Sequence, residues 1–293
     1  MTQRTLFISI GLAGAVVGAL TLASALYFIN GTFSSWFDSK NEYYTGHTIV
    51  TGQRDETRIV GFLTALLDVA KKVSGDHTIG PVDIASITHG NVKTYVKGFH
   101  DHDRMEDIPI HDEQGTRDRS FDLYVEFLPN KVDALLKSLG KKPWLARRPK
   151  VLVLLRVQNS TGSYILNSDE DDERGAEQRA AFQDSAWQVG LPLVLPMPDT
   201  LAVSKLTPED FDQVAPDQLS RLVSSNEADI GIIGHLIWVG GSMGWKADWS
   251  LQDEGGVHHW QIDDINFDGA FRNALRGAAQ ILSKHGEPAP NLN

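Results

Sequence analysis

The sequence contains no cysteine, which excludes two kinds of structural site. Without thiols the chain can form neither disulfide bonds nor thiolate metal centres. A domain of this size does not depend on disulfides, so their absence is compatible with an exported, oxidising compartment. Positive charge is also scarce: 27 Lys and Arg residues stand against 38 Asp and Glu residues, leaving a net charge of −11. Such an acidic chain is poorly suited to bind nucleic acid or to adhere directly to an anionic lipid surface.

The sequence also lacks recognisable catalytic motifs. The sequence has no Walker loop, no G-x-G-x-x-G, no HExxH and no paired-carboxylate motif. Gly240–Gly244 matches the G-x-S-x-G pattern of a nucleophile elbow, but that elbow needs a strand followed by a helix. The residues after Gly244 alternate in hydrophobicity as a strand does, so we interpret the motif as a hairpin turn. We therefore expect no catalytic residue, no cofactor and no enzymatic activity.

A histidine-rich stretch is the main candidate for metal chemistry. His100 and His102 would share one face of an extended segment, a spacing that can chelate zinc or copper, and His111 follows. The stretch from His100 to Arg119 is otherwise polar, and we interpret it as a solvated hairpin loop. A metal-binding protein or enzyme centred on these three histidines stays an alternative.

One long hydrophobic run stands out against this acidic background. Leu6–Ile29 holds 24 residues without a charge, more than the roughly 20 needed to cross a bilayer as a helix. Only Arg4 and the N-terminal amine precede it. The positive-inside rule then predicts an inner-membrane protein with a cytoplasmic N-terminus and its bulk, after Asn30, in the periplasm.

A cleaved signal peptide is the alternative interpretation of this run. Ala23-Ser24-Ala25 fits a cleavage pattern of small residues. The apolar core of a signal peptide is, however, usually only about 7–15 residues long. Aromatic residues after the run suit an interfacial belt at the outer membrane surface, namely Tyr27, Phe28, Trp36 and Phe37. We therefore expect a retained anchor.

Small residues within the run suggest a contact between helices in the membrane. They lie about one helical turn apart, which would let a second helix approach closely, and comprise Gly11, Gly14, Ala15 and Gly18. Lipid would surround the rest of this helix.

The remaining chain predicts an α+β fold: an N-terminal transmembrane helix followed by two α/β-type periplasmic domains with mixed sheets. The predicted divisions are an anchor at 1–30, a juxtamembrane linker at 31–42, a small α+β domain at 43–140, a linker at 141–149, a mixed-sheet α/β domain at 150–285 and a disordered tail at 286–293.

Hydrophobic periodicity predicts the individual elements. We expect strands at 44–51, 93–99, 120–128, 151–157, 164–166, 192–195, 230–239, 245–251 and 257–262. We expect helices at 55–73, 129–139, 176–189, 217–225 and 267–284, with a loop-rich stretch at 197–216.

Tryptophans mark two possible binding surfaces. Trp245, Trp249 and Trp260 could form an aromatic platform for a small ligand or glycan, although strand spacing is more typical of core residues. Trp238 and Met243, together with Trp245, could instead form a surface for a protein partner.

Several short motifs recur together in one bacterial family. They are Trp144 with Arg148-Pro149 before a VLVLL strand, GLPLVLP at 190–196, Ala228-Asp229 with Gly234, Gly244-Trp245-x-Ala247-x-Trp249-x-Leu251, and Trp260. In their order and spacing, residues 44–285 resemble the exported family called domain of unknown function 2066 (DUF2066). That family implies no catalytic residues. The second half also resembles, in fold alone, the N-terminal domain of TolB, which implies partner binding in the envelope.

The sequence thus favours a single-pass, membrane-anchored periplasmic protein that binds other inner-membrane or periplasmic proteins. An accessory subunit or assembly factor of an envelope complex fits this description. Two alternatives stay open: the histidine-centred metal protein and the tryptophan-lined ligand module.

Overall fold

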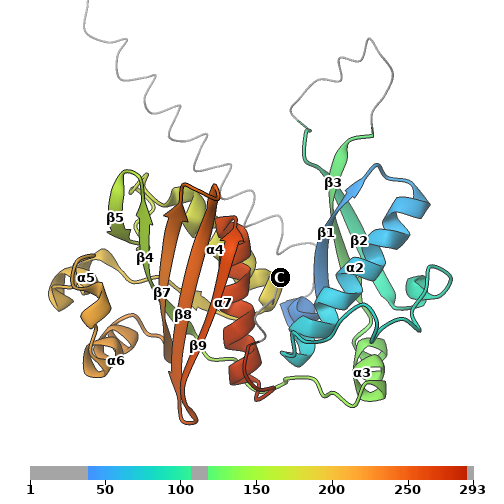
Figure 1. Cartoon of the computed structure of the whole chain (residues 1–293). Helices are drawn as coiled ribbons and strands as arrows, with labels where there is room; N and C mark the ends of the chain where they lie inside the picture. Colours follow the sequence, from blue (N-terminus) through green and yellow to red (C-terminus); the bar gives the residue numbers. More distant parts are fainter. Residues whose placement is uncertain (1–38, 107–117, 289–293) are drawn as a thin grey trace, which may run out of the picture. The chain divides into compact units, whose positions relative to one another are not determined.

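Two β-sheets with helices packed against them make up the part of the chain that the structure describes. The computed structural model describes residues 39–106 and 118–288, and Tyr43–Asn293 forms one compact unit (Figure 1). The mixed α+β class predicted from the sequence is confirmed. No helix within the described residues is long and apolar enough to cross a membrane.

The predicted membrane segment, Leu6–Ile29, lies outside the described residues. The same holds for the residues assigned to helix contact and to the interfacial belt, namely Gly11, Gly14, Ala15, Gly18, Tyr27, Phe28, Trp36 and Phe37.

The first sheet has three antiparallel strands in the order β1-β3-β2, and α2 packs against one face of it (Figure 1). Its elements are η1 Ser39–Tyr44, β1 Thr45–Thr51, α2 Asp55–Ser74, η2 Val92–Thr94, β2 Val96–Asp103, β3 Ser120–Phe127 and α3 Pro129–Ser138. Close packing of α2 depends on Gly61, because a Cβ there would lie 2.6 Å from the Leu123 side chain.

The strand predicted at 93–99 is shifted along the chain. Residues 92–94 form a 3-10 turn, and β2 instead runs on through His100–Asp103, which we had predicted to be loop. Pairing with β3 extends the strand, since His100 lies opposite Tyr124. Asp101 also anchors it to α2 by accepting a hydrogen bond from Arg58 Nε at 3.0 Å.

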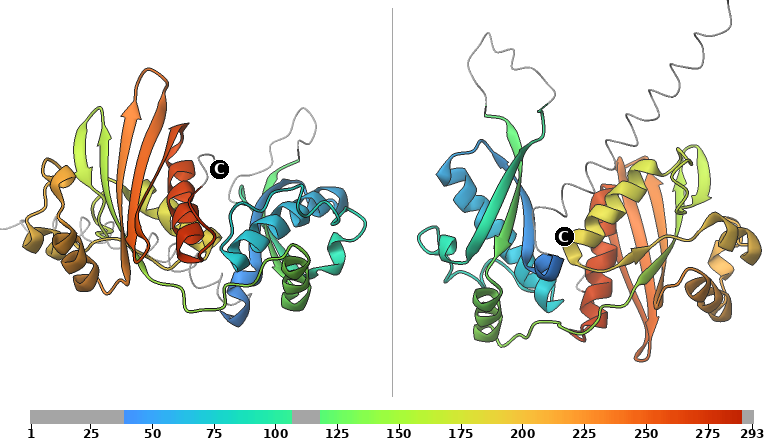
Figure 2. Two further views of the ribbon diagram at one scale, coloured as in Figure 1. Left: turned by 60° about the horizontal axis from the view of Figure 1, so that its bottom comes forward. Right: turned by 180° about the vertical axis from the view of Figure 1, so that it is seen from behind.

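The second sheet has the order β5-β4-β7-β8-β9, with β6 pairing only with β4. The β4 strand runs parallel to β7 and β6, and the other neighbours are antiparallel, so the sheet is mixed (Figure 2). Its elements are β4 Val151–Asn159, β5 Gly162–Ile165, α4 Ala176–Val189, β6 Leu193–Val194, α5 Pro198–Ser204, η3 Phe211–Gln213, α6 Pro216–Ser225, β7 Ile230–Val239, β8 Gly244–Asp253, β9 Gly256–Ile265 and α7 Phe267–Leu282.

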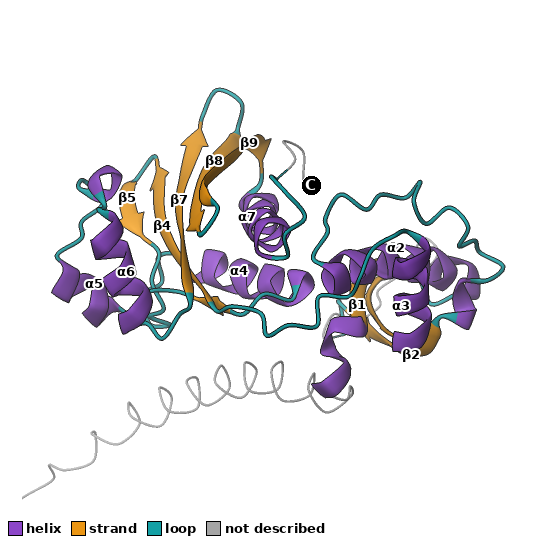
Figure 3. Cartoon of the chain, turned by 90° about the horizontal axis from the view of Figure 1, so that it is seen from below, coloured by secondary structure: helices purple, strands orange, loops and turns teal. Residues whose placement is uncertain are grey.

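Helices cover both faces of this second sheet (Figure 3). Val153 and Leu155 of β4 point into a core with α4 and α7, whereas Leu152 and Leu154 point into a core with α6 and η3. Burial on both faces explains why β4 is apolar at successive positions. The prediction that 197–216 is mostly loop is corrected, because this stretch contains the short helices α5 and η3.

Arg148 connects the ends of two helices. Its guanidinium donates to the carbonyl of Lys72 in α2 at 2.6 Å and to the carbonyl of Gly190, just after α4, at 2.8 Å. The same group lies 4.1 Å from the centre of the Tyr43 ring. Arg148 therefore satisfies carbonyl groups that both helix ends would otherwise leave unpaired.

Candidate functional site

The predicted histidine cluster is only partly described. His100 and His102 lie on β2, opposite Tyr124 and Asp122 of β3. The Nδ1 atom of His102 is 3.9 Å from Glu106 Oε2, and burial lowers the pKa of His100. His111 lies outside the described residues. Within 39–106 and 118–288, no three His, Cys, Asp or Glu side chains are grouped so that they could hold a metal ion.

The three tryptophans of the predicted ligand platform do not form an exposed surface. Trp249 is buried and packs edge-on against Phe182, with ring centres 6.3 Å apart. Trp260 is buried too, and its ring N–H donates to the carbonyl of Asn273 at 3.3 Å. Trp245 is partly buried and packs against the same core, so the three tryptophans fit the core interpretation of their strand spacing.

An exposed apolar surface lies at the turn between β7 and β8. We call it the hairpin tip, and it comprises the exposed Trp238, Val239 and Met243 together with Trp245, which is partly buried against the core. The G-x-S-x-G motif at Gly240–Gly244 lies in this turn and is followed by a strand, so its interpretation as a hairpin turn is confirmed.

Pairing of the two strands positions the aromatic residues of the hairpin tip. Trp238 and Trp245 are direct partners in the β7–β8 ladder, and their rings meet edge to face at 5.3 Å. Met243 follows in the left-handed region, with φ of 54°, and is 77% exposed. A fixed aromatic pair beside an adaptable methionine is suited to binding an apolar protein surface.

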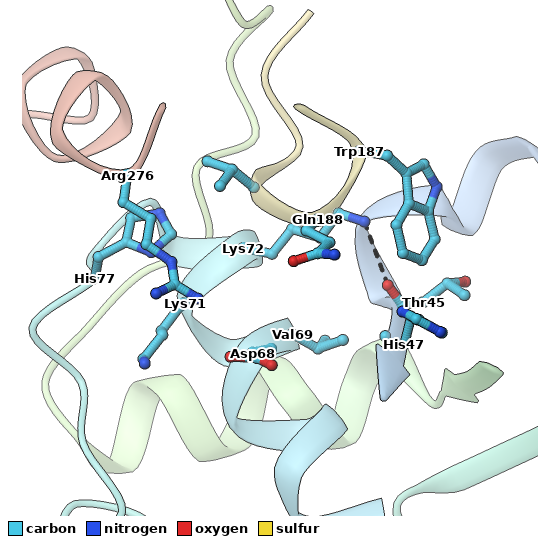
Figure 4. A pocket seen from close by; sticks show the side chains of 12 residues that line it. Thr45, His47, Asp68, Val69, Lys71, Lys72, His77, Trp187, Gln188 and Arg276 are labelled. Atoms are coloured by element: carbon cyan, nitrogen blue, oxygen red, sulfur yellow. Dashed lines mark hydrogen bonds between the residues drawn. The ribbon is translucent and has the colours of Figure 1, made fainter. Parts of the chain in front are cut away.

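A second candidate site is a small pocket that the sequence did not indicate. Residues of β1, α2, α4 and α7 line it, and its enclosed free space admits little more than one water molecule (Figure 4). Lys71 and Asp68 come from α2 and Arg276 comes from α7. His77, just after α2, is 7% exposed, and neither of its ring nitrogens has a hydrogen-bond partner.

Burial and neighbouring charges shift the pKa values of the residues that line this pocket. Burial lowers the pKa of Lys71, an effect that nearby Asp68 opposes. Burial likewise lowers the pKa of Arg276 and raises that of Asp68. The pKa of His77 lies well below its ordinary value because of burial and the neighbouring cations Arg276 and Lys71. His77 is therefore neutral at physiological pH, with one ring nitrogen as a donor.

No local sequence signal marks this pocket. Lys71 and Arg276 are each one of several charges on their helices, and about 200 residues separate them along the chain. Only the packing of α4 and α7 beside α2 brings these charges together.

Comparison with known proteins finds one family model that matches part of the chain. Residues 39–145 match a family described as Domain of unknown function (DUF8605). The matched segment contains the first sheet with α2 and α3, and it ends shortly before β4. No curated protein sequence matches the chain. The similarity supplies no activity, so function must be argued from the sites themselves.

Proposed function

We propose that this chain is a single-pass inner-membrane protein whose periplasmic part binds another envelope protein, as an accessory subunit or assembly factor. The uncharged run Leu6–Ile29 supports the anchor and its orientation. The exposed hairpin tip supports the protein contact. An anchor would hold the tip near partners in the same membrane and raise their effective concentration.

The hairpin tip is the observation on which this proposal mainly rests. Trp238, Val239 and Met243 are exposed within a few residues of one another, whereas an isolated apolar side chain at a surface needs no explanation. Burying a methionine side chain contributes about 1.5–3 kcal/mol, equivalent to roughly a tenfold or greater change in affinity. The partner we propose therefore offers an apolar pocket for Met243 and the Trp238–Trp245 pair.

Finer features of the predicted architecture belong to the same proposal. We propose that the two sheets correspond to domains at 43–140 and 150–285, joined by the linker 141–149. Small residues of the anchor, including Gly14 and Gly18, would pack against a second membrane helix. The resemblance to domain of unknown function 2066 supports export, and the fold resemblance to the N-terminal domain of TolB supports partner binding in the envelope.

Extraction of the full chain from native membranes in mild detergent tests the proposal. Met243→Asp should release a co-purifying envelope protein, because burying an unpaired carboxylate in an apolar pocket is unfavourable. Val203→Asp is the matched control, since Val203 on α5 is 85% exposed and lies outside the tip. Retention of the partner by Met243→Asp, or no co-purifying protein at all, would contradict the proposal.

N-terminal sequencing of the same sample tests the anchor. A retained anchor gives Met1 or Thr2 as the first residue. Cleavage after Ala25 would instead leave Leu26 first, and the single-pass arrangement would then be wrong.

A further inference from the structure

Two cationic side chains, Lys71 and Arg276, line the pocket of Figure 4 without an ion-pair partner among the described residues. Arg276 reaches from α7 toward Lys71 and Asp68 on α2, with His77 alongside. In the described part of the chain, the side chains of Lys71 and Arg276 form no ion pair at 4.0 Å or closer. Both are nevertheless half-buried, and a partly desolvated cation is most stable beside an anion.

His77 adds an independent observation. Its ring is buried, lines the pocket and has no hydrogen-bond partner on either nitrogen. Its backbone is fixed in place, because the His77 N–H donates to Gln280 Oε1 of α7 at 2.8 Å. A buried ring nitrogen is stable only with a hydrogen-bond partner, so His77 is suited to bind a polar group that enters the pocket.

Size and charge together indicate what could fill the pocket. Its charged lining comprises Lys71, Lys72 and Arg276 against Asp68 alone, an excess of positive charge in a chain whose net charge is −11. The enclosed space suits one or two oxygen atoms better than a tetrahedral phosphate. A guanidinium is also well shaped to bind a carboxylate through two parallel hydrogen bonds.

We propose that this pocket binds a single carboxylate group, held by Arg276 and Lys71 and hydrogen-bonded by His77. The carboxylate belongs either to a small free acid or to another polypeptide. This site shares no residue with the hairpin tip. Its failure would therefore leave the proposed partner contact unaffected.

Binding of acetate to the purified full chain in mild detergent tests this site. Isothermal titration calorimetry measures binding, with chloride and phosphate compared at equal ionic strength. Arg276→Met and Lys71→Met should each weaken acetate binding at least about tenfold, the effect of losing a charged hydrogen bond. Arg221→Met is the matched control, because the Arg221 side chain on α6 is 70% exposed and does not line the pocket.

A peptide arm distinguishes the two sources of the carboxylate. A short peptide with a free C-terminus is compared with the same peptide amidated. Tighter binding of the free peptide than of acetate assigns the site to a polypeptide carboxylate, whereas equal binding assigns it to small acids. No response to any carboxylate, equal responses to chloride or phosphate, or unchanged binding in Arg276→Met would each overturn the proposal.

Discussion

Arg148 should be the most stabilising charged residue of those packed at the ends of α2 and α4. It is 4% exposed and donates to the Lys72 carbonyl at 2.6 Å, the Gly190 carbonyl at 2.8 Å and the Val189 carbonyl at 3.2 Å. Replacing it with methionine keeps much of the volume but removes every donor. The helix-end carbonyls then stay buried without partners.

The size of the effect follows from these contacts. A hydrogen bond from a charged group contributes about 1.5–3 kcal/mol, and two of the three bonds are short. Each buried carbonyl that loses its donor costs about 1–3 kcal/mol. We therefore expect Arg148→Met to lower the free energy of unfolding by about 3–5 kcal/mol, a large part of the roughly 5–15 kcal/mol typical of folded proteins.

Urea unfolding of the full chain in mild detergent, followed by tryptophan fluorescence, measures this change. Arg147→Met is the control, because the Arg147 side chain is 77% exposed and pairs with Asp229 at 3.0 Å. Such an exposed ion pair contributes at most about 1 kcal/mol. If Arg148→Met proved no more destabilising than Arg147→Met, the assignment of Arg148 to both helix ends would be refuted.

Two further predictions concern the second sheet. Gly234→Ala should destabilise the protein by about 1–3 kcal/mol or more, because its new Cβ would overlap the Trp249 ring, whereas Gly241→Ala, in open space, should change stability by less than about 0.5 kcal/mol. Both are measured by the same urea unfolding. The hydrogen bond with Asp253 raises the pKa of His258 above its ordinary value. Its stabilisation is thus complete below about pH 6.5 and is lost as the pH rises through the raised pKa, so the stability difference between wild type and His258→Asn should shrink with rising pH. A difference that grows with pH would contradict this.

Elements with a strong apolar period were predictable from the sequence. The helix Phe267–Leu282 lies within its predicted bounds because its apolar residues recur with the helical period. The strand Ile230–Val239 matches its predicted bounds because it is a nearly continuous apolar run. The hairpin after Val239 was predictable as well, since alternation resumes at Trp245.

Elements whose pattern depends on distant partners were not predictable. The polar segment His100–Asp103 resembles a loop by composition, yet pairing with β3 makes it a strand. Pro198 suggested a break, but it occupies the first turn of α5, where its missing N–H has no cost. The pocket at Arg276 was not predictable for a related reason. Only tertiary packing places Arg276 beside Lys71. Glu287, in the predicted tail, likewise contacts His258 at 2.7 Å.

Site-specific photocrosslinking in native membranes tests the central claim most directly. A photoreactive amino acid replaces Met243 in the hairpin tip, and in a matched sample it replaces the similarly exposed Val203 on α5. We predict one defined covalent adduct with an envelope protein from position 243 and none from position 203. Absence of an adduct at position 243, or the same adducts from both positions, would contradict the claim that this protein acts by binding a partner through its hairpin tip.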